Sequence, residues 1–283
     1  MSAMSRRRGR RLVADASIRI LLVVFTCWTL GPIAWGVVSS LLPTEALIQT
    51  PPDLSPAKFT LANFEEVLGS GHNLVQGLLN SAIVATLTAG IALVLGSMAA
   101  YALARLRVPG GNRLLLIVLA TQMFPGIVIV IPLFVVLSRA GLIDTYAGLV
   151  IVYLSFILPI VIWVLKGFFE AIPPQLERAA AVDGASPLQT FRLIVLPISL
   201  PPLFATAVFA FIEAWNEFFF AIILTRLDVK TGPIAIAEFS GQYQTLYGQM
   251  VAAAVLASIP VVLLAVVFRQ YILKGFVEGA VKG

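Results

Sequence analysis

The stretch "ERAAAVDGASPLQTFRLIVLP", residues 177–197, separates two long apolar runs and has a mixed composition of its own. Its run of alanines favours a helix, and Gly184 suits the left-handed backbone that often ends one. Ser186, Pro187 and Gln189 then match the N-cap, the first helical position and the capping-box position of a second helix. The pattern predicts two short helices that meet at a bend around Gly184.

The chain that surrounds this stretch is too apolar for a soluble domain. Its 283 residues are 59% hydrophobic and 12% charged, whereas about a quarter of a typical soluble domain is charged. Apolar runs of about 18 residues or more can cross a bilayer core of about 30 Å as helices. The runs are 20–42, 78–103, 114–137, 147–165, 198–224 and 251–268. We therefore predict an all-α polytopic membrane protein with six transmembrane helices.

The distribution of Lys and Arg predicts the orientation, because basic residues in short loops stay on the cytoplasmic side. Most of them, including the "RRRGRR" run at 6–11, fall on the side that holds both termini and residues 166–197. Only Lys58, Arg139, Arg226 and Lys230 fall on the other side. We expect a multi-pass protein of the bacterial cell membrane with both termini in the cytoplasm. Its net charge of +5 then needs no nucleic-acid partner.

The predicted organisation follows from these runs. It consists of a basic N-terminus at 1–17, a first span at 18–42, an external loop at 43–77, a membrane core at 78–270 that contains a cytoplasmic loop at 170–197, and a cytoplasmic tail at 271–283.

The residue inventory argues against an enzyme. His72 is the only histidine, which excludes His-based metal sites and a Ser-His triad within the chain. A Walker A loop needs a lysine directly after a glycine, and no lysine here has that neighbour. We expect no metal, cofactor or ATPase site in this chain, so any ATP-driven work requires a cytoplasmic partner.

The third apolar run contains Pro125 and Pro132, which both remove backbone hydrogen bonds that lipid cannot replace. They predict kinks and a place inside the bundle. Gln122 lies one turn before Pro125 and has two interpretations, an interhelical hydrogen bond or a group that lines a pathway.

The fifth apolar run contains Glu213, Asn216 and Glu217. On one helix the two carboxylates would share a face, since they are four positions apart. An ionisable group at the centre of a membrane helix costs about 2.5–3.5 kcal/mol on insertion scales, which favours a wet cavity or a partner. The residues alone leave three roles open: lining a translocation path, interhelical hydrogen bonding, or a proton relay.

The opening stretch also matches a known motif. Ala179-Ala180, Gly184, Ile194, Leu196 and Pro197 read A-A-x3-G-x9-I-x-L-P, which resembles the EAA loop in the membrane subunits of binding-protein-dependent ABC importers. In that family the loop forms a coupling helix, which sits in a cleft of the cytoplasmic ATPase. The stretches "GLIDTYAGLV" at 141–150, "IWVLKGFF" at 162–169, "AWNEFFFA" at 214–221 and the terminal "GAVKG" are similar to the carbohydrate branch, in particular to the smaller maltose-type permease subunit.

The resemblance covers nearly the whole chain and implies the type I ABC importer transmembrane fold. It also implies a homologous second permease, two ATPase subunits that bind ATP and Mg, an extracellular or periplasmic sugar-binding protein, and a sugar substrate. The C-terminal tail with Gly279 and Lys282 would contact the ATPase. Arg178 stands where relatives carry an acid, so Glu177 and Asp183 are the alternative acidic partners.

Two alternatives come from other classes of protein. A self-contained secondary transporter would use Glu213 and Glu217 as a proton relay, but such proteins typically show inverted repeats and more spans. No clear internal repeat is present, and that hypothesis leaves the loop motif unexplained. An intramembrane enzyme lacks a plausible nucleophile and base. The sequence favours the importer.

Overall fold

The computed structural model describes residues 2–69, 73–106, 108–241 and 245–280, with side chains from Asp15 to Tyr271 within these ranges. Apart from an isolated bridge between Ser240 and Thr245, the regular elements of this described part are helices, which confirms the all-α prediction. They are α1 (Ser2–Ser40), α2 (Thr44–Leu47), η1 (Pro56–Lys58), α3 (Ala62–Gly69), α4 (Leu74–Arg105), α5 (Gly111–Thr121), α6 (Gly126–Arg139), α7 (Tyr146–Ala171), α8 (Pro174–Val182), α9 (Pro187–Thr190), η2 (Phe191–Val195), α10 (Leu196–Ile198), α11 (Leu200–Trp215), α12 (Phe219–Leu224), α13 (Gly232–Ala237) and α14 (Tyr247–Ala280).

By length and composition, four helices of the described part can each cross a membrane: α1, α4, α7 and α14. Two bent pairs also qualify, α5 with α6 at an angle of 96° and the Pro187–Ile198 stretch with α11 at 81°. Counting each bent pair as one span gives six. The predicted number of spans is therefore matched, although two of the six are broken.

The third span is broken between Thr121 and Gly126, a sharper change than the predicted kinks. Pro125 has an extended backbone (ψ 127°) and directly precedes α6, whereas Pro132 lies inside α6. Proline is tolerated at a helix start because its missing N–H would have no helical acceptor there. The position of each proline in the helix thus decides which one interrupts the span.

The prediction of one continuous helix at 198–224 is wrong. α11 ends at Trp215, and the chain resumes as α12 at Phe219. In the gap, the Glu217 carboxylate accepts hydrogen bonds from the backbone N–H groups of Phe220 at 2.8 Å and Ala221 at 3.0 Å. An anion that satisfies the free amides at a helix start favours a new helix there. Glu213 and Glu217 therefore do not share the face of one helix.

The chain divides into two compact units. Unit 1 contains residues 1–71 and 239–256. Within it the buried Asn63 amide donates to the carbonyls of Ser40 at 2.9 Å and Leu42 at 2.8 Å. A Cβ added at Gly248 would lie 2.7 Å from the Leu42 carbonyl oxygen, so only glycine fits at this close approach.

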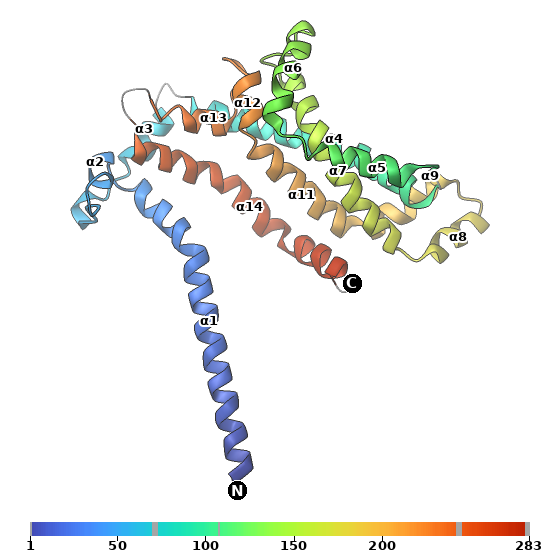
Figure 1. Ribbon diagram of the computed structural model, residues 1–283, viewed down its shortest axis with the longest axis horizontal. Coiled ribbons are helices and arrows are strands. Elements are labelled where there is room, and N and C mark those ends of the chain that lie inside the picture. Colours follow the sequence, from blue (N-terminus) through green and yellow to red (C-terminus); the bar gives the residue numbers. More distant parts are fainter. Residues whose placement is uncertain (1, 70–72, 107, 242–244, 281–283) are drawn as a thin grey trace. The chain divides into compact units, whose positions relative to one another are not determined.

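Unit 2 contains residues 72–238 and 257–283, and its core is formed by α4, α7 and α11, which pack side by side (Figure 1). Tyr153, Ile157 and Val161 of α7 are buried at helical spacing. A Cβ at Gly96 of α4 would meet the Val161 side chain at 2.6 Å, so the two helices approach at a small residue, as is common in membrane bundles. Polar groups at both ends of this packed core carry the sites described next.

Candidate coupling site

The first part of the site is the C-terminal end of α8, which turns at Gly184. Gly184 has a φ of +84°, in the left-handed region. The N–H of Ala185 donates to the Ala180 carbonyl at 2.9 Å, and the N–H of Gly184 donates to the Ala181 carbonyl at 3.1 Å. These two bonds form a Schellman motif, which satisfies the last carbonyls of the helix. The predicted glycine stop is confirmed.

The second part is the start of α9, where the predicted capping box is present. The Ser186 hydroxyl accepts from the Gln189 N–H at 3.3 Å, and the Gln189 side chain accepts from the Ser186 N–H at 2.8 Å. Pro187 occupies the first turn. We call residues 174–190, comprising α8, the turn and α9, the coupling hairpin.

The second helix does not continue beyond α9 as a regular α-helix, because the π-helical segment η2 follows directly. There the Leu196 N–H donates to the Phe191 carbonyl, five residues earlier. Such π-bulges occur frequently at functional sites. Of the remaining motif residues, Ile194 and Leu196 are half-buried and Pro197 is exposed.

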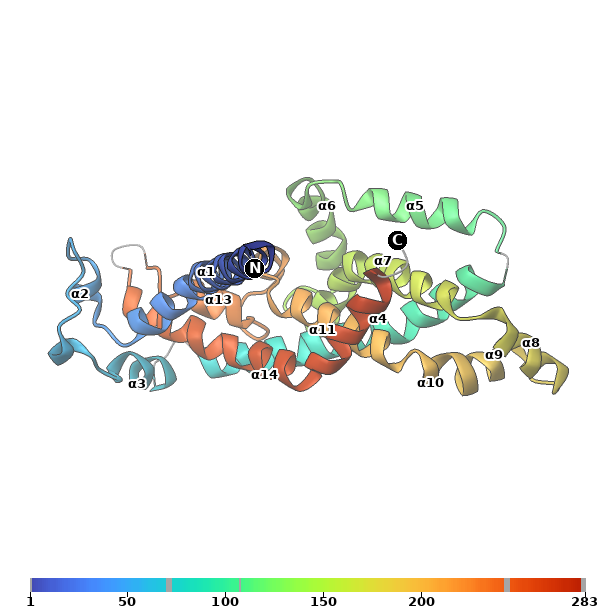
Figure 2. The same ribbon diagram turned by 90° about the horizontal axis from the view of Figure 1, so that it is seen from below.

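The outer face of α8 is open to solvent. Arg178, Ala179 and Asp183 are exposed, and 87% of Val182 is accessible. Ala180, in contrast, is buried. Figures 1 and 2 both place α8 and α9 at one end of this unit, beyond the packed helices. The helix thus presents a free face with one basic and one acidic side chain.

Glu177 is not part of that free face. The guanidinium of Arg105, the last residue of α4, donates from Nε to Glu177 Oε1 at 2.5 Å. Its Nη2 donates to the carbonyls of Phe169 at 2.7 Å and Ile172 at 2.6 Å, at the C-terminus of α7. The Tyr101 hydroxyl donates to Glu177 Oε2 at 3.3 Å. Only 15% and 16% of the Arg105 and Glu177 side chains are exposed, so this joint of three helices is largely shielded from water.

An aromatic cluster holds the other end of the coupling hairpin. The Tyr101 ring centre lies 4.8 Å from that of Phe191 and 6.3 Å from that of Phe169. Phe169 and Phe191 meet edge to face at 6.2 Å. The hairpin is therefore anchored where it begins, by Arg105, and where it ends, by Phe191.

Sequence reasoning had used Arg105 only to orient the chain and had missed its pairing. Arg105 and Glu177 are 72 positions apart, so no local pattern links them. The available signal was the composition of the two helix ends, a basic residue at the last turn of α4 and an acidic residue in the first turn of α8.

The polar residues predicted for the translocation path occupy different settings. Gln122 donates to the Ser155 carbonyl at 3.4 Å, whereas Glu213 and Asn216 are exposed at the end of α11. Glu217 caps α12 through the N–H groups of Phe220 and Ala221. Among the described residues, no three His, Cys, Asp or Glu side chains gather as a metal site requires.

The two helix breaks meet inside unit 2. A Cβ placed on Gly126, at the start of α6, would lie 3.3 Å from the rings of both Phe219 and Phe220 in α12. Phe220 also stacks on Phe156 of α7 with a ring separation of 5.6 Å. The structure therefore places the start of α12, which Glu217 caps, against the start of α6 in the broken third span.

Part of the predicted C-terminal tail is helical. α14 continues from the membrane span through Gly279 to Ala280, beyond the predicted boundary at 271. Lys282 lies outside the described residues.

The geometry of the described residues is that of an all-helical, multi-span membrane protein, and comparison with known proteins identifies its family. The family described as "Binding-protein-dependent transport system inner membrane component" matches residues 92–277, and the chain belongs to that family. This confirms the resemblance inferred from the EAA-type loop.

Individual relatives and a solved structure sharpen the comparison. The chain is 39% identical over 259 residues to the trehalose transport system permease protein SugB of Mycobacterium tuberculosis, covering 90% of this chain and 93% of the relative. It is 36% identical over 269 residues to the trehalose/maltose transport system permease protein MalG of Thermococcus litoralis, covering 94% of this chain and 95% of the relative. A crystal structure of a bacterial ABC transporter that imports the acidic polysaccharide alginate matches with a TM-score of 0.74 at 23% identity, covering 96% of this chain and 98% of the other. The fold is the type I ABC importer transmembrane fold.

Proposed function

We propose that this chain is a permease subunit of an ATP-driven sugar importer. It forms half of the translocation path, and a homologous permease supplies the other half. Two cytoplasmic ATPases bind ATP and Mg, and an extracytoplasmic binding protein delivers the sugar. The names of the relatives, which include trehalose and maltose permeases, support the substrate class. The excess of basic residues supports cytoplasmic termini.

The observation that carries the coupling role is the construction of the coupling hairpin. To transmit movement, the hairpin must be fixed to the membrane helices at one side and must expose another side to the ATPase. Arg105 fixes the hairpin, because it bonds Glu177 in the first turn of α8 and the carbonyls at the C-terminus of α7 at the same time. Hydrogen bonds to charged groups contribute about 1.5–3 kcal/mol each, so this joint resists separation of the helices. Movement of α8 by the ATPase then moves α4 and α7 with it.

The same joint selects between the two candidate acids. Because Glu177 is held by Arg105, Asp183, the residue that directly follows α8, is the candidate acid that remains exposed for an ATPase contact. Arg178, five positions earlier, is also exposed and offers a cation to the same partner. We assign the ATPase-facing role to Arg178 and Asp183.

Reconstitution tests this function. The chain would be placed in proteoliposomes with its partner permease, ATPase and binding protein, and uptake of labelled trehalose, maltose and longer oligosaccharides would be measured. We expect uptake only with ATP on the ATPase side and binding protein on the other. Uptake that follows a pH gradient without ATP would instead identify a secondary transporter and refute the proposal.

A further inference from the structure

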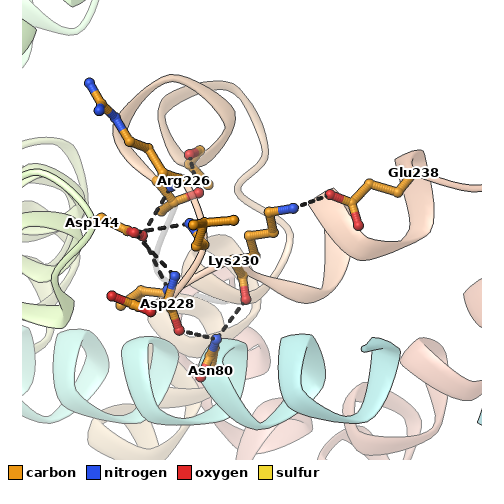
Figure 3. Close-up of polar contacts among 10 residues, drawn as sticks. Asn80, Asp144, Arg226, Asp228, Lys230 and Glu238 are labelled. Carbon is orange, nitrogen blue, oxygen red and sulfur yellow. Dashed lines mark hydrogen bonds and ion pairs between the residues drawn. The ribbon is translucent and has the colours of Figure 1, made fainter. Parts of the chain in front are cut away.

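At the opposite end of the packed core, the turn between α6 and α7 carries a carboxylate that the coupling role does not use. Asp144 has a φ of +58°, and its own N–H donates to the Leu224 carbonyl at 2.8 Å. This backbone conformation directs the side chain toward the chain segment that follows α12 (Figure 3).

Asp144 binds four consecutive backbone amides of that segment. Its Oδ1 accepts from the N–H groups of Arg226 at 3.0 Å and Val229 at 3.2 Å. Its Oδ2 accepts from those of Leu227 at 3.0 Å and Asp228 at 3.1 Å. Four N–H groups that converge on one point create a positive potential, which an anion matches far better than a neutral group.

Asn80 of α4 holds the carbonyls of the same segment. Its Nδ2 donates to the carbonyls of Asp228 at 3.2 Å and Lys230 at 2.8 Å, as Figure 3 shows. Its Oδ1 accepts from the Tyr146 hydroxyl at 2.7 Å and from Gln76 at 3.0 Å. Asn80 is only 1% exposed, so these bonds are made away from water.

The segment 226–230 is thereby held on both sides of its backbone, while its first three side chains stay exposed and Val229 packs into the core. Arg226 and Asp228 are exposed, and 82% of Leu227 is accessible. A loop without helical or sheet hydrogen bonds would normally sample many conformations, because its amides can bond to water instead. In this segment Asp144, in the turn before α7, and Asn80, on α4, take the place of water as hydrogen-bond partners of the backbone.

We propose that Asp144 is a positioning residue for transport, which holds segment 226–230 in one conformation for the binding protein. The segment also becomes part of the same body as α4 and α7. These two helices are joined to the coupling hairpin by Arg105 at their other end. The transport consequence rests on the proposed function, whereas the ordering of the segment does not.

Hydrogen exchange on the assembled complex tests the ordering directly. In the wild-type protein we expect the four amides of residues 226–229 to be protected, although the side chains of the first three residues are exposed. Asp144→Asn should accelerate their exchange by at least about tenfold, since a neutral amide offers one acceptor oxygen to four donors. Asp53→Asn is the matched control, because that carboxylate bonds Ser55, two residues away on another predicted outer loop.

The same variants test the consequence for transport. In Asp144→Asn we expect the concentration of binding protein that half-saturates ATP hydrolysis to rise about tenfold, with the maximal rate retained. The Asp53→Asn control should match the wild type. A loss of maximal rate alone would point to a merely structural role and overturn the positioning role.

The possible failures are distinguishable. Unprotected amides at 226–229 in the wild-type protein would overturn the inference without any variant, even if Asp144→Asn failed to assemble. Faster exchange with an unchanged response to binding protein would refute the role in transport. Absence of ATP-driven sugar uptake by the wild-type complex would remove the proposed function and leave the exchange result standing.

Discussion

Arg105 and Glu177 meet at 2.5 Å where α4, α7 and α8 converge, and this contact takes the Glu177 carboxylate out of reach of a partner protein. The acidic residue that directly precedes Arg178 in the motif is thus part of the chain's own framework. Arg105 also bonds two carbonyls at the end of α7, and the contact is shielded from water. We therefore expect this ion pair to stabilise the structure more than a surface salt bridge does.

Glu177→Gln should reduce the amount of sugar transported per ATP hydrolysed by about tenfold, while basal ATP hydrolysis continues. The change preserves size but removes the charge that Arg105 faces, which is worth about 1.5 kcal/mol or more. The measurement is the ratio of labelled sugar taken up to phosphate released in proteoliposomes.

Glu170→Gln provides the control for that experiment. Glu170, whose side chain is 48% exposed, forms an ion pair with Lys166 one turn away on α7, at 2.6 Å. Such pairs contribute about 0.3–0.5 kcal/mol, so coupling should remain close to wild type. Equal ratios in Glu177→Gln and Glu170→Gln would show that the Arg105 joint does not transmit the movement.

Gly184→Ala should weaken coupling through backbone strain alone. No atom lies within 4 Å of a Cβ at this position, but the φ of +84° costs an L-residue about 1–2 kcal/mol. We expect reduced ATP-driven uptake and faster proteolysis of the coupling hairpin. Gly167→Ala is the matched substitution, since its Cβ also meets open space but sits inside the helix α7, where alanine is favoured. If both variants behaved alike, the turn at Gly184 would not matter to function.

Glu217 should behave as a helix cap and not as a proton relay. Glu217→Ala removes the acceptor for two backbone amides of α12 and should lower the free energy of unfolding by about 1 kcal/mol. Glu217→Gln keeps one acceptor oxygen, so it should retain ATP-driven uptake. Thermal unfolding in detergent measures the first effect, and uptake under an imposed pH gradient measures the second. Uptake that responds to the gradient in the wild type but not in Glu217→Gln would restore the relay hypothesis.

Acid should weaken the Asp144 contact in a defined window. Burial alone would raise the pKa of this carboxyl, but the four backbone donors outweigh it and hold the pKa below the ordinary value of 3.8. The folded protein therefore binds this proton more weakly than the unfolded chain. The stabilisation is present above pH 3.8 and disappears as the pH falls through the lowered folded value.

The matched comparison is wild type against Asp144→Asn. Their difference in unfolding temperature should stay constant from neutral pH down to about pH 5 and shrink below the ordinary Asp pKa. If the difference in unfolding temperature already changed between pH 5 and pH 8, a group other than Asp144 would be responsible for the pH dependence.

Several features could be predicted from sequence because their causes are local. Long apolar runs indicate spans regardless of what packs against them. The Gly184 stop and the Ser186 capping box depend on residues within one helical turn, so a reader of the sequence can place them. The motif around them was also sufficient to indicate the family.

Other features required the tertiary structure. The end of α11 at Trp215 was missed because the cap at Glu217 competes with a strongly apolar run that favours one helix. Arg105 and Glu177 are 72 positions apart, and Asp144 lies 82 to 85 positions from the amides that it binds.

The sequence by itself therefore determined the membrane class and the two short helices of the coupling hairpin. Only the packing of α4 against α7 and α11 decided which charged side chains face one another, because a charge buried by that packing must find its partner among the groups that the fold brings near. That is why Glu177 is held by Arg105 in a shielded contact, whereas Asp183 is exposed.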